Sequence, residues 1–346
     1  MQPIVAIRRG PRLPSIALLT SPDASTAHGL LGCSALVSEM TATSRPLVVT
    51  QGDPEGIGPE LILRVGAEGA LRAGDVVFVD PDRLHRLADA LPPWARAGLD
   101  AVLPLLAPRL QGLSQVEALR LGVDAVLEQP GRALVTAPID KARCRDEGFA
   151  FPGHTEYLAA RAGGCEVAML MTGPTLKIVL ATIHLPLREV ADALREEDVV
   201  RAARLLAAGL RDHFGCARPR IAVLGLNPHA GERGMLGDEE TRIIAPALER
   251  LRSIDPHASF HGPLPADTAI HQHARGDYDG VVAMYHDQGL APFKVIHFHD
   301  GVNMTLGLPF VRTSPDHGTA RDIAGRGIAD ASSLLHSIRI ARGGAS

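Results

Sequence analysis

Three histidines follow apolar runs of the chain, and their imidazoles could bind a metal or transfer protons. His184 follows the run that begins at residue 176, His229 follows the run at 221–226, and His286 follows the run at 281–285. Three imidazoles that converge on one point suit a borderline divalent ion such as Zn²⁺, Co²⁺ or Mn²⁺. Three protein ligands leave coordination positions open for a substrate, as in catalytic sites. We therefore predict a shared metal or catalytic site.

Aspartates stand at similar places, namely Asp53 after the run at 47–50, Asp140 after that at 133–136, and Asp287 beside His286. One polar residue after a strand is usually a solvated loop residue, whereas several at equivalent places favour a site. Two His-x-His pairs, at 271/273 and 297/299, lie in polar surroundings, and we expect surface histidines there.

Several segments have residues that suit an anion. The segment GDPEGIGPE at 52–60 has three glycines before an expected helix, which allows close approach of a ligand, although a tight turn without a ligand explains it equally well. His154 and Thr155 open another helix, where Thr155 is also a candidate N-cap. Lys294, Asn303 and Arg312 suit phosphate or carboxylate, although each taken singly fits a surface residue.

The segment 317–329 has three glycines and small residues before a helix, which fits a loop shaped around a flat ligand. The chain has no G-x-G-x-x-G in a dinucleotide-binding context, no G-x-x-x-x-G-K-[ST] and no H-E-x-x-H. A Rossmann fingerprint, a P-loop and a zincin protease site are therefore not indicated.

Short runs rich in Val, Ile and Leu alternate with amphipathic segments from residue 46 on, which predicts an α/β fold with a largely parallel sheet. We expect strands at 47–50, 76–80, 133–136, 167–172, 176–183, 221–226, 281–285 and 302–306, and helices at 59–68, 155–162, 187–195, 197–214, 239–252 and 329–341. Ligands of open α/β sheets bind beyond the carboxyl ends of the strands, where the histidines and aspartates above are expected.

The composition limits the function classes. The chain has 346 residues, enough for about two domains. A net charge of −4 and an aromatic content of 3% give no general attraction to nucleic acid and few stacking platforms. No apolar run reaches membrane-spanning length. Four widely spaced cysteines fit a reducing cytoplasm. Residues 1–44 lack a clear period and are expected to be a disordered or mis-assigned extension, with Met40 as an alternative start.

Seven segments together carry a family resemblance that covers about residues 46–342. They read GDPEGIGPE, PGHTEYL, NPHAGERG, GPLPADT, YHDQGLAPFK, GVNMTLGLPFVRTSPDHGTA and DIAGRGIAD. In this order they resemble the 4-hydroxythreonine-4-phosphate dehydrogenase family of pyridoxal phosphate biosynthesis. The resemblance implies an isocitrate/isopropylmalate dehydrogenase-like fold of two α/β domains with the active site in a cleft between them. Residues 45–148 plus 308–346 would form the cofactor side, and 149–307 the metal, substrate and dimer side.

The resemblance also implies the chemistry and its residues. The reaction would be NAD- or NADP-dependent oxidation of 4-phosphooxy-L-threonine at C3, then decarboxylation to 3-amino-2-oxopropyl phosphate, in a homodimer with a shared active site. One divalent ion (Zn, Mg or Co) would be bound by ligands from both subunits, with His286 expected from the partner chain. The implied assignments are His184, His229 and His286 for the metal; His154, Thr155, Lys294, Asn303 and Arg312 for the substrate; Lys294, Asp287 and Asp267 for catalysis, with Lys294 or Asp287 as base; and Gly318, Thr319 and Asp322 for the cofactor.

Two other functions stay open. Relatives with the same motifs oxidise phosphorylated four-carbon sugar acids, which differ from the expected substrate by little more than one amine. A metal-dependent phosphatase could also use histidines, aspartates and cationic phosphate ligands, and its rate would not depend on NAD⁺.

Overall fold

The structure is a computed structural model that describes residues 44–108 and 110–344. The extension expected at 1–44 lies outside the described residues apart from Ser44, and so does Met40 as a possible start. No helix among the described residues is long and apolar enough to cross a membrane.

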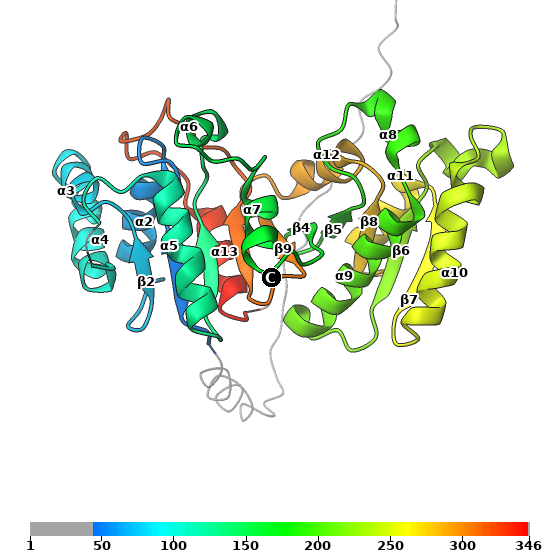
Figure 1. The fold of residues 1–346 in the computed structure, drawn as a ribbon, viewed down its shortest axis with the longest axis horizontal. Coiled ribbons are helices and arrows are strands. Elements are labelled where there is room, and N and C mark those ends of the chain that lie inside the picture. The colour runs from blue at the N-terminus through cyan, green and yellow to red at the C-terminus, as the bar shows by residue number, and fades with distance from the viewer. Residues whose placement is uncertain (1–43, 109, 345–346) are drawn as a thin grey trace, which may run out of the picture. The chain divides into compact units, whose positions relative to one another are not determined.

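The fold is α/β, as expected, and its strands form one ten-stranded sheet with the order β2-β1-β3-β10-β9-β4-β5-β8-β6-β7 (Figure 1). The strands are β1 (Leu47–Thr50), β2 (Val76–Phe78), β3 (Ala133–Thr136), β4 (Ala168–Thr172), β5 (Lys177–Leu180), β6 (Arg220–Leu224), β7 (Ser259–Leu264), β8 (Gly280–Ala283), β9 (Val302–Leu306) and β10 (Arg312–Pro315). The helices are α2 (Gly58–Ala67), α3 (Pro81–Ala90), α4 (Trp94–Val102), η1 (Leu103–Leu105), α5 (Gln115–Glu128), α6 (Lys141–Asp146), α7 (His154–Arg161), α8 (Leu187–Ala193), α9 (Glu196–Phe214), η2 (Pro228–Gly234), η3 (Glu240–Ile244), α10 (Ala245–Ile254), α11 (Ala266–Ala274), α12 (His286–Ile296) and α13 (Ser332–Ala341).

The expectation of a largely parallel sheet is wrong for the centre of the sheet. Strands β10, β9, β4 and β5 pair antiparallel with one another, between a parallel group around β1 and a parallel group around β8. Central strands are buried on both faces whichever way they run, so the apolar pattern alone does not distinguish the two directions.

Some elements were not predicted from the sequence, and for strand β10 the reason is a weak apolar signal. Strand β10 has the polar sequence RTSP although all four residues are buried. Helix α5 was not expected either, although Ser114 caps it by accepting a hydrogen bond from the Glu117 amide at 3.2 Å. Strand β7 and helices α3, α4, α6, α11 and α12 were also not predicted.

Helix α9 agrees with its expected position. Its first turn contains Glu196, Glu197 and Asp198, which interact favourably with the helix dipole, and it ends at Gly215 with a left-handed φ of 67°. One face of the helix buries nine residues, and this face packs on strands β4, β5, β6, β8 and β9. Burial of this apolar face against the strands holds the helix on the sheet and stabilises the strands after which the histidines follow.

Strands β5, β8 and β6 lie side by side and run parallel, so their carboxyl ends meet at one edge of the sheet. His184, His229 and His286 follow these three ends. The sequence reasoning therefore identified the correct edge. The division of the chain into the two expected domains stays a prediction.

Candidate active site

A cavity of about 510 Å³ lies at this edge of the sheet. Its walls come from the segment after β3, the start of α7, strands β4, β9 and β10, the segment after β5, helix α12 and the segment after β10. Of the residues assigned from the sequence, the cavity brings together His154, Thr155, His184, His286, Lys294, Asn303, Arg312 and Gly318. His229, Asp267, Asp287, Thr319 and Asp322 do not line it.

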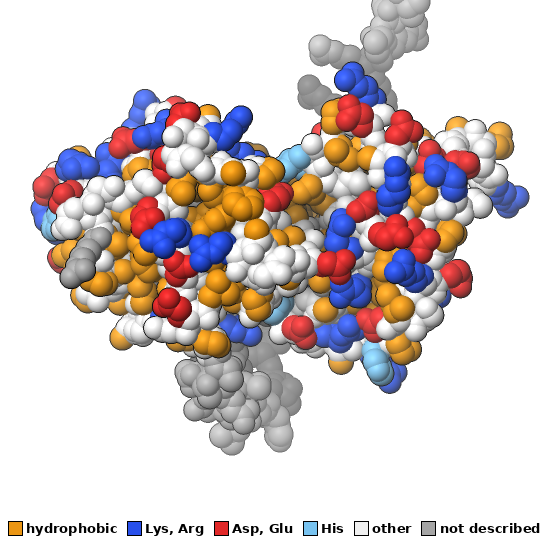
Figure 2. Space-filling view, in the orientation of Figure 1, with side chains coloured by type: hydrophobic (Ala, Val, Ile, Leu, Met, Phe, Trp, Pro, Cys, Tyr) orange, Lys and Arg blue, Asp and Glu red, His pale blue; other side chains and the backbone are white. Residues whose placement is uncertain are grey.

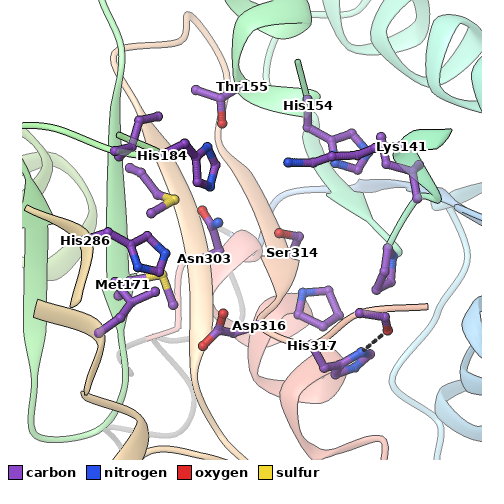
Figure 3. Close-up of a pocket in the computed structure, with 18 of the residues that line it drawn as sticks. Lys141, His154, Thr155, Met171, His184, His286, Asn303, Ser314, Asp316 and His317 are labelled. Atoms are coloured by element: carbon purple, nitrogen blue, oxygen red, sulfur yellow. Dashed lines mark hydrogen bonds between the residues drawn. The ribbon is translucent and has the colours of Figure 1, made fainter. Parts of the chain in front are cut away.

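Two imidazoles face each other in the cavity. The ring centroids of His184 and His286 are 5.8 Å apart, and Figure 3 shows both rings directed into the cavity. Burial lowers the pKa of His184, and the nearby charges of Lys141 and His286 lower it further. A neutral imidazole is the form that ligates a metal.

Asp287 contacts His286 from outside the cavity. Its Oδ1 is 2.7 Å from the Nδ1 of His286, while its own side chain is 84% exposed. A proton on Nδ1 would be donated to this carboxylate, which leaves the Nε2 lone pair free for a ligand. Asp287 therefore orients His286; it does not line the 510 Å³ cavity, but it lines a smaller pocket of about 230 Å³ that also includes His184 and His286.

His229 is separate from the other two histidines. It lies in η2, where residues 229–233 all have left-handed φ angles, and its side chain is exposed. Among residues 44–108 and 110–344, no group of three His, Cys, Asp or Glu side chains is placed to hold a metal ion. The three expected ligands thus do not meet within one chain. Of the three expected ligands it is His229 that lies apart, whereas we had expected His286 to be the one contributed separately.

The other acidic residues have different surroundings from those expected. Asp267 is exposed on α11 and accepts a hydrogen bond from the Thr268 amide at 2.7 Å. Asp53 is fully buried and pairs with Arg143 at 3.2 Å and Arg321 at 2.5 Å. Asp140 caps α6 by accepting two backbone hydrogen bonds. The Asp53 and Asp140 side chains thus hold loops together, and neither lines the cavity.

One histidine of each His-x-His pair is not a surface histidine. His273 is 4% exposed and bonds the Tyr278 carbonyl and the Lys177 amide. His297 is 3% exposed and bonds Thr175 and Asp300. Both rings connect neighbouring elements, and their hydrogen bonds explain why they are buried.

One end of the cavity begins at helix α7. The N-cap is Gly153, which has no side chain to accept the first amide hydrogens, so Thr155 is not the N-cap. His154 is the first helical residue, and its Nε2 is buried without a partner. Burial lowers the pKa of His154 well below its ordinary value, and the charges of Arg312 and Lys141 act in the same direction.

Arg312 is a buried cation at the same end of the cavity as the start of α7. It is 2% exposed on β10, and its guanidinium donates to the Thr305 hydroxyl at 3.0 Å and the Thr136 hydroxyl at 2.7 Å. It forms no ion pair with any residue in the described part of the chain, and its Nε has no partner there. Burial lowers the pKa of Arg312 to about 10. An unpaired buried cation with free donors is suited to bind an anion.

Lys294 and Asn303 lie near the two imidazoles. The Lys294 ammonium pairs with the Asp316 carboxylate, with Nζ and Oδ2 2.6 Å apart. Burial raises the pKa of Asp316. The Oδ1 of Asn303 is buried without a partner. Asp316 was not picked out from the sequence, although it stands in the SPDHGTA segment that carries the family resemblance.

The segment after β10, residues 316–330, is fixed to the rest of the protein at several points. The buried Glu60 carboxylate accepts hydrogen bonds from the Gly325 amide at 2.7 Å and the Ala329 amide at 3.3 Å. The Thr319 carbonyl accepts from the Ile57 amide at 2.9 Å. A Cβ at Gly56 would lie 2.8 Å from that same carbonyl. The glycines of the GDPEGIGPE segment therefore allow approach of the protein's own backbone.

Figure 2 shows acidic and basic side chains interspersed over the visible face, without a large patch of one sign.

Comparison with known proteins agrees with the resemblance seen in the motifs. The family model described as pyridoxal phosphate biosynthetic protein PdxA matches residues 107–341. A 4-hydroxythreonine-4-phosphate dehydrogenase of Paracoccus denitrificans is 44% identical over 319 residues, which covers 86% of this chain and 97% of that protein. One from Caulobacter vibrioides is also 44% identical, over 329 residues, covering 86% of this chain and 97% of the relative.

Solved structures give the same result. The 4-hydroxythreonine-4-phosphate dehydrogenase of Klebsiella pneumoniae superposes with a TM-score of 0.73 at 37% identity, covering 86% of this chain and 98% of that one. A terephthalate 1,2-cis-dihydrodiol dehydrogenase of Burkholderia xenovorans is more distant, with a TM-score of 0.61 at 27% identity, covering 87% of this chain and 99% of that one.

Proposed function

The chain belongs to the PdxA family of pyridoxal phosphate biosynthetic proteins, and on that premise we propose that it oxidises 4-phosphooxy-L-threonine at C3 and decarboxylates the product to 3-amino-2-oxopropyl phosphate. It is an oxidoreductase of the 4-hydroxythreonine-4-phosphate dehydrogenase type, like its relatives. The observation that carries the substrate proposal is the buried, unpaired Arg312 beside the uncapped start of α7 in the same cavity as two facing imidazoles.

The phosphate would bind at the Arg312 end. The amides at the start of α7, the Arg312 guanidinium and the neutral His154 ring can all donate hydrogen bonds to phosphate oxygens. These contacts are remote from the carbon that reacts. Their binding energy can therefore orient C3 toward His184 and His286.

The two imidazoles can supply two of the ligands of a divalent ion, because burial favours the neutral form of His184 and the Nε2 of His286 is free. When bound there, a Zn, Mg or Co ion would lower the pKa of the substrate hydroxyl and stabilise the negative charge that develops as CO₂ leaves. The remaining protein ligand is proposed to be His229 of a partner subunit, which would make the enzyme a homodimer with a shared site.

The dimer proposal is supported by exposed apolar side chains near the histidines. Leu187 beside His184 is 70% exposed, and Met235, which follows η2, is 82% exposed. Exposed apolar side chains are unfavourable in water, whereas their burial against a second copy of the chain would be favourable. We also place the enzyme in the cytoplasm, because none of the cysteines in the described part of the chain forms a disulfide.

Lys294 is proposed to take the proton of the C3 hydroxyl. An ammonium cannot accept a proton, but its partner Asp316 is 2.6 Å away and has a raised pKa, so Asp316 can hold the proton that Lys294 gives up. The neutral amine then accepts the hydroxyl proton. The expected bases Asp287 and Asp267 are less suitable, because neither lines the cavity.

The hydride acceptor is proposed to be NAD or NADP, which supplies the oxidising chemistry. Gly318, Thr319 and Asp322 would hold it on the segment that Glu60 anchors. Gly318 lines the cavity, so this segment adjoins the proposed substrate site.

Absorbance of the reduced nicotinamide tests this proposal. Purified protein with a divalent metal and NAD⁺ or NADP⁺ should reduce the cofactor with 4-phosphooxy-L-threonine and release CO₂. A faster reaction with a phosphorylated four-carbon sugar acid would select that alternative substrate. Phosphate release at a rate that does not depend on NAD⁺ would select the phosphatase.

A further inference from the structure

Lysine is rare in this chain. Of its 35 basic residues only Lys141, Lys177 and Lys294 are lysines, and the rest are arginines. Two of the three line the same cavity, Lys294 and Lys141. A chain that uses arginine nearly everywhere else retains lysine where a compact ammonium is needed, since the two side chains differ in shape and hydrogen-bond geometry. Lys294 has a role in the proposed reaction, whereas Lys141 has none so far.

The backbone that carries Lys141 is held firmly. Lys141 begins α6 directly after Asp140, whose carboxylate caps the helix through the Ala142 and Arg143 amides at 2.9 and 3.1 Å. The Asp140 amide in turn donates to the buried Gln115 side chain at 2.9 Å. The start of the Lys141 side chain is thus fixed at the cavity wall.

The ammonium of Lys141 has no counter-ion within the described residues. No carboxylate lies within 4.0 Å of Nζ, although Glu156 lines the same cavity. Every other cation discussed at this edge has an acidic partner except the buried Arg312. An exposed lysine without a partner is ordinary, but this one extends into a cavity that already contains Arg312.

Lys141 also lies close to the start of α7. A Cβ at Gly153, the N-cap, would be 3.8 Å from the Lys141 Nζ and 3.4 Å from the Glu156 Oε2, so the ammonium and this carboxylate lie on the same side of the helix start without forming an ion pair. Figure 3 shows the side chain running beside His154, with its nitrogen directed toward the His184 side. The partial positive charge of the helix start disfavours a nearby ammonium; the Glu156 carboxylate in the first turn offsets this in part, and a bound anion would offset it further. The unpartnered Nε2 of His154 and Nε of Arg312 are buried in the same region.

We propose that Lys141 is a further substrate-binding residue whose ammonium binds the phosphate group of the substrate together with Arg312 and the start of α7. The proposal rests on the proposed function for the identity of the substrate, but not for the presence of a phosphate site. The phosphate is the favoured anion over the carboxylate, because the uncapped amides, the buried guanidinium and Lys141 meet at the α7 end.

Chemical modification with inorganic phosphate as the probe tests this directly. Reductive methylation by formaldehyde and a borane, followed by peptide mass spectrometry, reports the rate at which each lysine is modified. Phosphate should slow the modification of Lys141 several-fold relative to chloride at equal ionic strength. Lys177, which lies outside this cavity, serves as the internal control and should react at the same rate in both salts. Equal rates for Lys141 in the two salts would overturn the proposal.

Kinetics supply the second measurement. Lys141→Met should raise KM for the phosphorylated substrate by roughly 10- to 100-fold, the range for one charge-assisted hydrogen bond. The turnover number kcat and KM for the nicotinamide cofactor should change little. The control is Arg145→Ala, which removes a positive charge from the same helix at an exposed position outside the cavity and should leave KM unchanged.

A Lys141→Met enzyme with low kcat and normal KM would instead make Lys141 a proton-transfer group and contradict phosphate binding. Wild-type protein that oxidises no phosphorylated substrate would refute the proposed function alone. The methylation experiment needs neither turnover nor cofactor, so it still decides the role of Lys141 in that case.

Discussion

Replacing Arg312 by methionine should weaken substrate binding without a matching loss in the stability of the folded protein. The guanidinium is 2% exposed and has no carboxylate partner among the described residues, and burial lowers its pKa from the ordinary value to about 10. Such a fall corresponds to roughly 3 kcal/mol of unfavourable desolvation of the charged form. This desolvation lowers the stability of the substrate-free folded protein at neutral pH, because Arg312 is charged at every pH well below 10.

The substitution also removes favourable contacts. Two hydrogen bonds to Thr136 and Thr305 are lost, at about 1 kcal/mol each, while the methionine fills most of the volume. These opposing contributions nearly cancel, so Arg312→Met without phosphate should melt within a few degrees of wild type. KM for the phosphorylated substrate should rise about 100-fold, since the proposed charge-assisted contact between the guanidinium and the phosphate would be removed.

Thermal melting with and without inorganic phosphate, together with steady-state kinetics, measures both effects. Phosphate should raise the melting temperature of wild type and leave that of Arg312→Met unchanged. A variant that melts several degrees lower, with KM unchanged, would refute the reasoning and make Arg312 a structural residue.

Three further outcomes are expected. His184→Ala should abolish turnover and lower the bound metal, and near-normal values of both would remove His184 from the metal site. The pKa of His154 is well below its ordinary value in the folded protein, so between about pH 7 and pH 5 the unfolded chain binds a proton that the folded chain does not, and the protein should become less stable as the pH drops. In His154→Gln the melting temperature should fall less over this pH range. A pH profile identical to that of wild type would contradict this reasoning. Glu60→Gln weakens the anchor of the 316–330 segment and should raise KM for NAD(P) about tenfold with substrate KM unchanged, whereas the reverse pattern would place the cofactor elsewhere.

The position of the site on the sheet was readable from the sequence, because it depends on local order along the chain. A buried run followed by a polar residue predicts a strand and its carboxyl end, and parallel neighbours place those ends together. His184 and His286 were found in this way. The same local rule failed at β10, since a buried strand of sequence RTSP has no apolar signal.

The surroundings of each side chain were not readable. Asp53 and Asp287 stand at strand ends as His184 does, yet one is buried between two arginines and the other orients an imidazole from outside. His273 and His297 looked like surface residues and are buried. Partners distant in sequence decide these cases, and their positions do not follow from local spacing.

The sequence by itself determined the α/β class, the family motifs and the edge of the sheet at which the cavity lies, because periodicity and residue type are local properties. Only the tertiary structure decided which charges have partners. Arg312 and Lys141 share a cavity and neither forms an ion pair within the described residues, and His229 does not line the cavity that contains His184 and His286. Burial and pairing depend on contacts between distant segments, so the missing partners of Arg312 and Lys141 and the separate position of His229 could not be predicted from the sequence.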